Sequence, residues 1–319
     1  MNKHIRSTIK RLITENGTFI ALGVMILAAS LIYREFFTYS NLSNVLRQTS
    51  MVGLVSIGMT LVILTAGIDL SVGATVALSA IIAAKLSVYG LVPAMLASLL
   101  AGIVIGGVNG FIVNNFKIVP FIATLAVQMA IRGIAYLLTD MRSIAVDRSA
   151  ETFIALGRGY FIGVPIPVII FLVSALLMIF VTRKTSFGRS VYAIGGNEDA
   201  ARMMGLRVKQ NKMLAYVITG FFSALAGVIL CARLGAGQPV SGDGWEMDAI
   251  ASVVIGGTLL SGGVGGVGPT ICGVLIIGFT KNIINLQGDI NSYWQKIVTG
   301  LILLLVIIAQ NRSGKKEAL

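Results

Sequence analysis

Two groups of polar side chains interrupt the apolar stretches of this sequence, and both could contact a solute. The first lies in Gly67-Ile-Asp-Leu-Ser-Val-Gly73, where the carboxylate Asp69 has no cation beside it. An ionisable group between membrane-length apolar runs is costly unless it is satisfied, and it often marks the path of an ion or substrate. Two interpretations stay open. Asp69 or Ser71 caps the next helix, or the two residues form a gate or a substrate contact.

The second group repeats at every fourth residue. Thr124, Gln128 and Arg132 would share one face of a helix whose other faces are apolar. Such a polar stripe favours a pathway for a polar solute. The alternative is a ladder of hydrogen bonds between helices, in which Arg132 reaches toward the outer surface.

A third polar segment predicts a short, complete helix. Asn197 is a preferred N-cap, acidic side chains in the first turn suit the helix dipole, and Gly205 favours a helix end. The helix is too short to be stable alone, so it must dock on its own bundle or on a partner. Its residues are Asn197, Glu198, Asp199, Ala200, Ala201, Arg202, Met203, Met204 and Gly205.

Residue types exclude most enzyme chemistry. The single histidine, His4, lies in the polar N-terminal tail, and Cys231 and Cys272 lie in apolar surroundings without a metal-ligand spacing. Residues 263–268 match GxGxxG but lack the strand, helix and acidic residue of a dinucleotide site, and no GxxxxGK[ST] loop for ATP occurs. We therefore expect no enzyme, no catalytic residue, no metal site and no cofactor bound by this chain.

Composition places the chain in a membrane. It is 56% hydrophobic and only 12% charged, against roughly 25% charged in soluble domains, and its mean hydropathy is +0.89. The net charge is +12, but Lys and Arg cluster at the ends of apolar segments rather than in a stripe with aromatic residues. This distribution indicates membrane topology and lipid contact instead of nucleic-acid binding.

The apolar runs predict an all-α integral membrane protein with about ten transmembrane helices. The region 248–284 is broken by glycine pairs but is long enough for two of these spans at about 1.5 Å per residue. The other eight runs lie at 18–33, 50–66, 70–88, 91–113, 118–139, 165–182, 213–232 and 294–310.

Charge predicts the orientation of a single membrane domain over residues 1–319. Lys and Arg are enriched in cytoplasmic segments, and they are frequent in the tails 1–17 and 311–319 and in the loop 183–212. Both termini and this loop are therefore expected in the cytoplasm. Residues 234–248 are acidic and suit an external loop.

Three motifs in this order resemble the ribose-type permeases of bacterial ABC importers, the transmembrane subunits of the branched-chain amino acid/ribose permease family. They are Gly67-Ile-Asp-Leu-Ser-Val-Gly73, Asn197-Glu-Asp-Ala-Ala followed by Gly205, and Asp248-Ala-Ile-Ala-Ser-Val-Val-Ile-Gly-Gly-Thr258. The likeness covers roughly residues 18–310. One departure from broader importers is Lys212-Met-Leu-Ala215, which stands where those have Ile-x-Leu-Pro.

The resemblance implies a fold like that of the cobalamin-importer permease and a multi-pass location in the bacterial cytoplasmic (inner) membrane. It also implies a homodimer of this chain, an ABC ATPase subunit that binds ATP and Mg, and an extracytoplasmic sugar-binding protein. Residues 197–205 would be the coupling helix that contacts the ATPase. Gln128 and Arg132 could then hydrogen-bond sugar hydroxyls.

The function expected from this resemblance is import of a monosaccharide, ribose foremost, by alternating access. The same machine could instead import another monosaccharide or a ribose-derived signalling molecule. A self-sufficient secondary transporter is a further alternative, since it would need intramembrane ionisable groups such as Asp69 and Arg132.

Overall fold

The computed structural model describes residues 3–288, 291 and 293–317, with side chains from residue 17 to residue 310 apart from 289, 290, 292 and 309. Within these residues, seven helices are long and apolar enough to cross a membrane. They are α2 (Tyr39–Leu64), α3 with a 3-10 extension (Val72–Leu86, then Ser87–Tyr89), α4 (Leu91–Phe116), α5 (Pro120–Thr139), α7 (Ile166–Lys184), α10 (Val208–Leu234) and α12 (Val267–Leu286).

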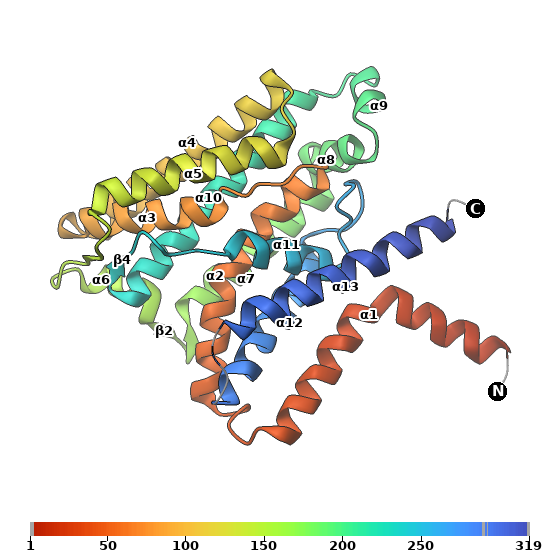
Figure 1. Cartoon of the computed structure of the whole chain (residues 1–319), viewed down its shortest axis with the longest axis horizontal. Coiled ribbons are helices and arrows are strands. Elements are labelled where there is room, and N and C mark those ends of the chain that lie inside the picture. The colour runs from red at the N-terminus through yellow and green to blue at the C-terminus, as the bar shows by residue number, and fades with distance from the viewer. Residues whose placement is uncertain (1–2, 289–290, 292, 318–319) are drawn as a thin grey trace.

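The first and last helices add shorter apolar segments. These are Gly17–Ile32 within α1 (Lys3–Ile32) and Trp294–Ile308 within α13 (Trp294–Glu317). The basic tails 1–16 and 311–319 lie outside the residues whose side chains are described. Figure 1 nevertheless shows the start of α1 and the end of α13 on the same side of the molecule as α9.

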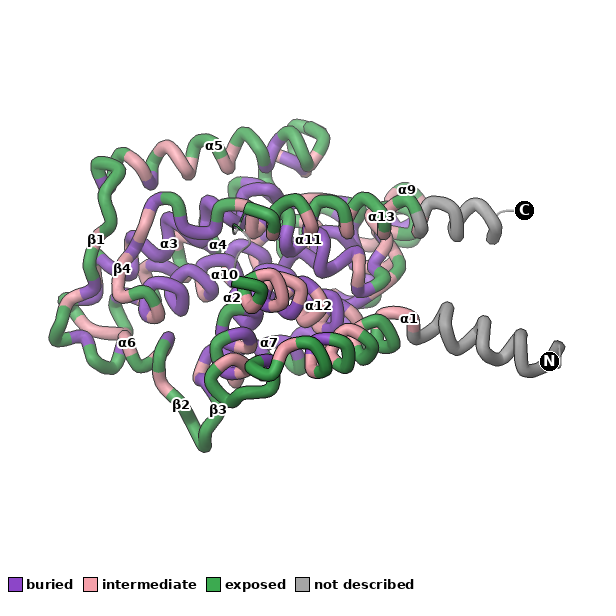
Figure 2. Tube along the Cα trace, turned by 60° about the horizontal axis from the view of Figure 1, so that its bottom comes forward, coloured by how far each residue is buried: buried purple, intermediate pink, exposed green. Residues whose placement is uncertain are grey.

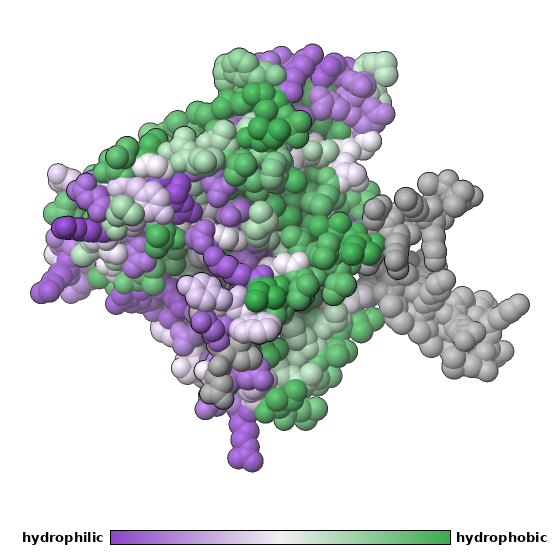
Figure 3. All heavy atoms as spheres, viewed as in Figure 1, coloured by the Kyte–Doolittle hydropathy of each residue, from purple (hydrophilic) through white to green (hydrophobic). Residues whose placement is uncertain are grey.

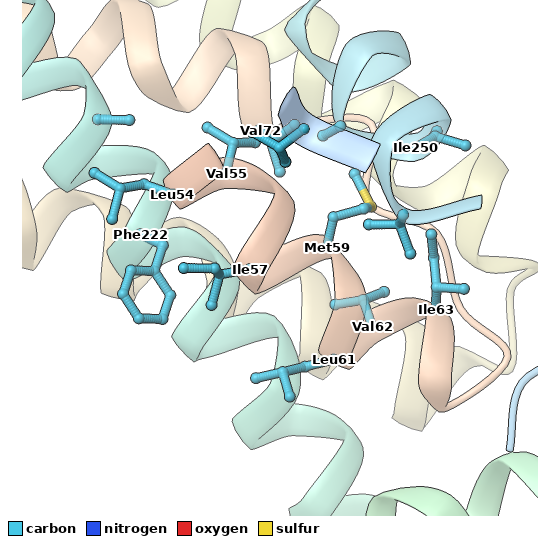
Figure 4. Close-up of a cluster of buried hydrophobic side chains, with 14 of the residues drawn as sticks. Leu54, Val55, Ile57, Met59, Leu61, Val62, Ile63, Val72, Phe222 and Ile250 are labelled. Carbon is cyan, nitrogen blue, oxygen red and sulfur yellow. The ribbon is translucent and has the colours of Figure 1, made fainter. Parts of the chain in front are cut away.

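The central helix is α2, which packs against α7, α10, α11 and α12. Leu54, Met59 and Ile63 are among its fully buried side chains. Phe222 of α10 lies beside Leu54 and Ile57 of α2 (Figure 4). Less of α4, α5 and α7 is buried, namely 28%, 17% and 33% of their apolar windows against 83% for α2. Figure 2 shows α5 along the edge of the molecule. An apolar sequence alone does not distinguish a central helix from a peripheral one, because lipid is as apolar as a protein core.

Glycines bring α4 and α10 into backbone contact. A Cβ on Gly102 would overlap the carbonyl of Gly220, and one on Gly106 would overlap the backbone of Tyr216. Small residues at this spacing allow close helix approach where lipid supplies no hydrophobic force for association. These glycines therefore allow α4 and α10 to pack backbone to backbone.

Two ends of the molecule carry the non-spanning elements. One end, called here the α9 end, holds α8 (Ser186–Gly196) and α9 (Glu198–Met203). The other, the α6 end, holds α6 (Glu151–Arg158) and two small antiparallel sheets, in which β1 (Ile144–Ala145) pairs with β4 (Ala236–Gly237) and β2 (Tyr160–Phe161) with β3 (Val164–Pro165). Figure 3 shows hydrophilic residues gathered at both ends and hydrophobic residues between them.

The region 248–284 differs from a plain pair of spans. It contains α12 and the much shorter α11 (Trp245–Ile255), joined by the non-helical segment 256–266. An 11-residue helix is about 17 Å long at 1.5 Å per residue, roughly half of the hydrocarbon thickness. The glycine pairs in 256–266 end α11 early, and several adopt positive φ, among them Gly257 at +90° and Gly262 at +86°.

Candidate functional site

Helix α9 forms as its sequence predicts. The Asn197 side chain accepts a hydrogen bond from the Ala200 amide at 2.9 Å, and Gly205 has φ +80°, a conformation that suits glycine at a helix end. Glu198 forms ion pairs at 2.9 Å with Arg202 on α9 and with Lys212 on α10. The Lys212 hydrogen bond holds the pKa of Glu198 below its usual value.

One side of α9 docks on its own chain and the other is open. Ala201 is fully buried against Ile194 of α8 and Val208 of α10. In contrast, Met203 is 83% exposed and Met204 is 69% exposed. Exposed methionines are soft, adaptable contact residues, so α9 presents an apolar surface suited to a partner.

Helix α8, which we did not expect from the sequence, joins α9 to the membrane-embedded part. The Tyr192 hydroxyl of α8 donates a hydrogen bond to the Gly265 carbonyl at 2.9 Å. Gly195 of α8 lies directly against the backbones of Leu64 and Gly263. The Gly263 amide also donates to the Leu64 carbonyl at 3.0 Å. The end of α2, helix α8 and segment 256–266 therefore meet at one place. The local signal was available: Thr185 caps α8 by accepting from the Gly188 amide.

The turn between α2 and α3 is closed by hydrogen bonds. Asp69 is 1% exposed, and its Oδ1 accepts from the Ser71 amide at 2.9 Å and the Ser71 hydroxyl at 2.7 Å. Asn109 of α4 donates to Asp69 at 3.2 Å and to Ser71 Oγ at 2.7 Å. Thr124 Oγ1 accepts from the Leu70 amide at 3.0 Å. Asn109 was not among the residues expected at this turn. Its polar amide between Gly106 and Gly110, within an apolar run, was the feature that could have identified it.

Asp69 and Ser71 do not cap α3 in the expected manner. Ser71 occupies the N-cap position but its side chain makes no cap hydrogen bond, and Asp69 accepts from Ser71 rather than from the first helical turn. The carboxylate instead orders the turn itself. Its satisfaction by three donors explains how a buried acid without a cation can be tolerated here.

Arg132 stabilises a second interruption of helical structure, the first being the turn between α2 and α3. Its guanidinium donates to the carbonyls of Pro239 at 2.6 Å and Ser241 at 2.9 Å, in the non-helical segment 238–244 before α11. The Arg132 side chain is half-buried in this position. Gln128, one turn away on α5, is half-buried. The two interruptions touch, because a Cβ on Gly73 would overlap the Gly242 carbonyl.

Helix α11 is tied to its surroundings at both ends. Near its start, Asp248 pairs with Lys281 of α12, and Asp243 just before it pairs with Lys296 of α13 at 2.9 Å. At its end, the Ile255 carbonyl accepts from Thr18 Oγ1 of α1 at 3.0 Å, and the Val254 carbonyl accepts from Gln310 of α13 at 2.9 Å. Carbonyls at a helix end have no partner within the helix, and in lipid the protein itself must supply one.

The predicted candidate residues thus form two separate groups. Residues 197–205 lie at the α9 end, whereas Asp69, Ser71, Thr124 and Arg132 bond to one another or to the backbone around the two interruptions. The two groups are connected through α8 and segment 256–266, which leads into α11 and α12.

Comparison with known proteins covers nearly the whole chain. Residues 41–307 match the family model described as branched-chain amino acid transport system / permease component. The chain is 42% identical to the ribose import permease protein of Haemophilus influenzae, over 97% of both chains. It is 42% identical to the ribose import permease protein of Bacillus subtilis, over 93% of both.

A third relative has another sugar in its name. The D-allose transport system permease protein of Escherichia coli is 38% identical, over 91% of this chain and 90% of that protein. A comparison with solved structures gives no significant match.

Proposed function

Because the chain belongs to the family of permease components of branched-chain amino acid transport systems, we propose that it is the membrane-spanning subunit of an ATP-driven importer for ribose. The chain is a multi-pass protein of the bacterial cytoplasmic membrane. The observation that carries the substrate is 42% identity to ribose import permeases along nearly the full length. The similarity to a D-allose permease leaves another monosaccharide as an alternative substrate. A ribose-derived signalling molecule is a second alternative substrate.

Helix α9 is the proposed coupling helix. An ABC ATPase subunit would dock at the α9 end, on the surface that Met203 and Met204 leave exposed, and would bind the ATP and Mg. This chain needs no active site of its own, since its residues only transmit the movement. The contacts of α8 with Leu64 and Gly263 support a mechanical path from α9 to α2 and α11.

The two interruptions are the proposed gate. Asp69, Ser71 and Thr124 hold the turn before α3, and Arg132, with Gln128 beside it, holds the segment before α11. Non-helical backbone at membrane depth is tolerated where protein or a water-filled cavity surrounds it, and transporters use such breaks at their pathways. Closure of the ATPase would shift α9 and α8, and the shift would reach these breaks through segment 256–266.

The remaining architecture follows from the same proposal. The seven long helices, the apolar parts of α1 and α13, and α11 with segment 256–266 would make about ten crossings of a bilayer near 30 Å thick, as in the cobalamin-importer permease fold. Both termini and the loop 183–212 would be cytoplasmic. Two copies of the chain would enclose the sugar path, with the sugar-binding protein docking at the α6 end.

The test is uptake of labelled ribose into vesicles that carry the chain with its ATPase subunit and binding protein. Wild type is compared with Gly205→Asp, which strains the end of α9 because Gly205 has φ +80°. Gly90→Asp is the matched control, since Gly90 has φ +93° and, like Gly205, open space at its Cβ position. We expect ATP-dependent uptake that Gly205→Asp abolishes in an assembled complex and Gly90→Asp retains.

Two results would contradict the proposal. Uptake that continues without ATP or without the ATPase subunit would indicate a secondary transporter. ATP-dependent uptake of a different sugar, which inhibits ribose uptake by competition, would support the importer function but change the assigned substrate.

A further inference from the structure

A cavity of about 590 Å³ lies apart from both groups of candidate residues. Helices α2 and α12 form its main walls, α10 contributes two residues, and α11 and α13 contribute one each. Its volume falls in the range of about 300–1,000 Å³ typical of small-molecule sites. Asp69, Ser71, Thr124, Gln128 and Arg132 are not among its lining residues.

Carboxamides dominate the polar wall. Asn44 and Gln48 of α2 point into the cavity from one face of their helix, and Asn285 of α12 and Gln295 of α13 line it from other helices. A carboxamide offers both donors and acceptors, and a sugar hydroxyl does the same. The wall is thus matched to a neutral ligand with many hydroxyl groups.

Helix packing explains some of these amides but not all. Asn41 and Asn282 donate to each other's side-chain oxygens at 3.1 and 2.8 Å, and so join α2 to α12. Asn44 and Gln48 follow Asn41 along the same face of α2, yet both are exposed, and among the described residues their side chains have no hydrogen-bond partner. Their position fits contact with a solute better than contact between helices.

The charges of the cavity disfavour a cation and leave Arg233 as its one cationic side chain without a carboxylate partner among the described residues. No carboxylate lines it, and its cationic residues are Arg233 and Lys281. Lys281 pairs with the Asp248 carboxylate of α11, which cancels its charge. Trp245 adds an aromatic surface against which the CH groups of a sugar ring can pack.

The cavity is also connected to the proposed gate. Trp245 is the first residue of α11, directly after the segment that Arg132 holds through the Pro239 and Ser241 carbonyls. Lys281 and Asp248 join the cavity wall to the same helix. A movement of α11 would therefore change the shape of the cavity.

We propose that this cavity is a transit site for a neutral monosaccharide within the permease itself, with Asn44 and Gln48 as its main hydrogen-bonding residues. The proposal rests on the proposed function as a sugar importer and adds a binding site in this chain. Contacts through exposed amides are weak, and weak binding lets a transported solute leave again.

Protection from thiol labelling tests binding directly. Gln48→Cys and the control Gln287→Cys are made in the permease–ATPase complex without the binding protein, and alkylation of this chain is timed with and without D-ribose. Gln287 is the exposed residue directly after α12, and it does not line the cavity. The native Cys231 and Cys272 are buried, so the introduced thiol is the accessible one. We expect ribose at millimolar concentration to slow labelling at position 48 about threefold or more and to leave position 287 unchanged.

Uptake by the double variant Asn44→Leu/Gln48→Leu gives the second measurement. The double variant removes two hydrogen bonds at about 1 kcal/mol each, so we expect ribose uptake to fall roughly thirtyfold, with Gln287→Leu as control. Equal labelling rates with and without ribose, in a complex whose wild type imports ribose, would overturn the transit site alone. Wild type that imports no ribose while another neutral sugar protects position 48 would instead overturn the ribose assignment and keep the site. Protection by ribose 5-phosphate but not by ribose would overturn the neutral ligand.

Discussion

Helices α9 and α11 are both too short to be stable in isolation, but different parts of the chain complete them. Asn197, Glu198, Arg202 and Gly205 supply the cap, the ion pair and the end of α9 from within the segment itself. Helix α11 depends on residues far away in the sequence. Its partners are Thr18 of α1, Lys281 of α12 and Gln310 of α13.

The difference reflects the surroundings of the two helices. Helix α9 has an exposed side, so water can satisfy the groups that its own residues leave open. Helix α11 is buried, and Ala249, Ala251 and Val253 are fully enclosed, so other helices must satisfy its free carbonyls. A half-length helix inside a membrane protein therefore depends on contacts with the other helices. A short helix at the surface can instead be specified by a few residues of its own segment.

The largest expected effect comes from Asp248→Ala, which leaves the half-buried Lys281 in the cavity wall without its partner. Breaking a fully buried pair by removal of one partner costs about 3–5 kcal/mol, and the partial exposure of Lys281 places the expected cost at the bottom of that range. We expect a lower unfolding temperature of the purified permease in detergent, followed by intrinsic fluorescence. The double variant Asp248→Leu/Lys281→Met should recover most of the loss. An unchanged unfolding temperature of Asp248→Ala would mean that α11 does not depend on this contact.

A smaller effect is expected for Thr18→Val, which keeps the shape of the side chain and removes the donor to the Ile255 carbonyl. An unsatisfied buried acceptor costs about 1–3 kcal/mol. Thr182→Val is the control, because the Thr182 hydroxyl bonds to the carbonyls of Met178 and Ile179 within its own helix. Thermal unfolding should separate the two variants. Equal loss in both would show that the end of α11 finds another donor.

For α9, the expected loss is local. Asn197→Ala removes the cap, at a cost of about 1 kcal/mol, while Asn197→Asp retains an acceptor. We expect faster amide exchange across residues 198–203 in Asn197→Ala alone, with the global unfolding temperature unchanged. If the unfolding temperature fell as it does for Asp248→Ala, the contrast between the two helices would be lost.

The smallest effect is the pH dependence of α9. The pKa of Glu198 is lowered in the folded protein, chiefly by its hydrogen bond to Lys212. The stabilisation is therefore complete above the pKa of an unfolded glutamate, near 4.5, and is lost as pH falls through the lower folded value. Exchange protection of α9 should decline below about pH 4.5 in wild type and show little pH dependence in Glu198→Gln. Equal pH profiles would exclude a role for this carboxylate.

Sequence patterns predicted the long helices and α9 because both are encoded locally. Apolar runs of membrane length mark α3, α4, α5, α7 and α10 with boundaries close to the observed ones. The run 50–66 marks α2 but misses its polar first part, since the helix begins at Tyr39. The cap and glycine signals mark α9. The same local view failed for α8, whose N-cap signal at Thr185 we did not use, and for α6 and the short strands. It also did not identify Asn109, whose importance depends on Asp69 forty residues earlier in the chain.

What the sequence by itself determined is therefore the membrane class, the order of most helices and the short helix 197–205. Hydropathy reports only that a segment is apolar, and the little-buried helix α5 is as apolar as the central α2. Only the tertiary structure decided which helix is central, where Arg132 donates and how α11 ends. It alone assembled Asn44, Gln48, Trp245 and Gln295 around one cavity, because these residues are far apart in the chain and meet only when the helices pack.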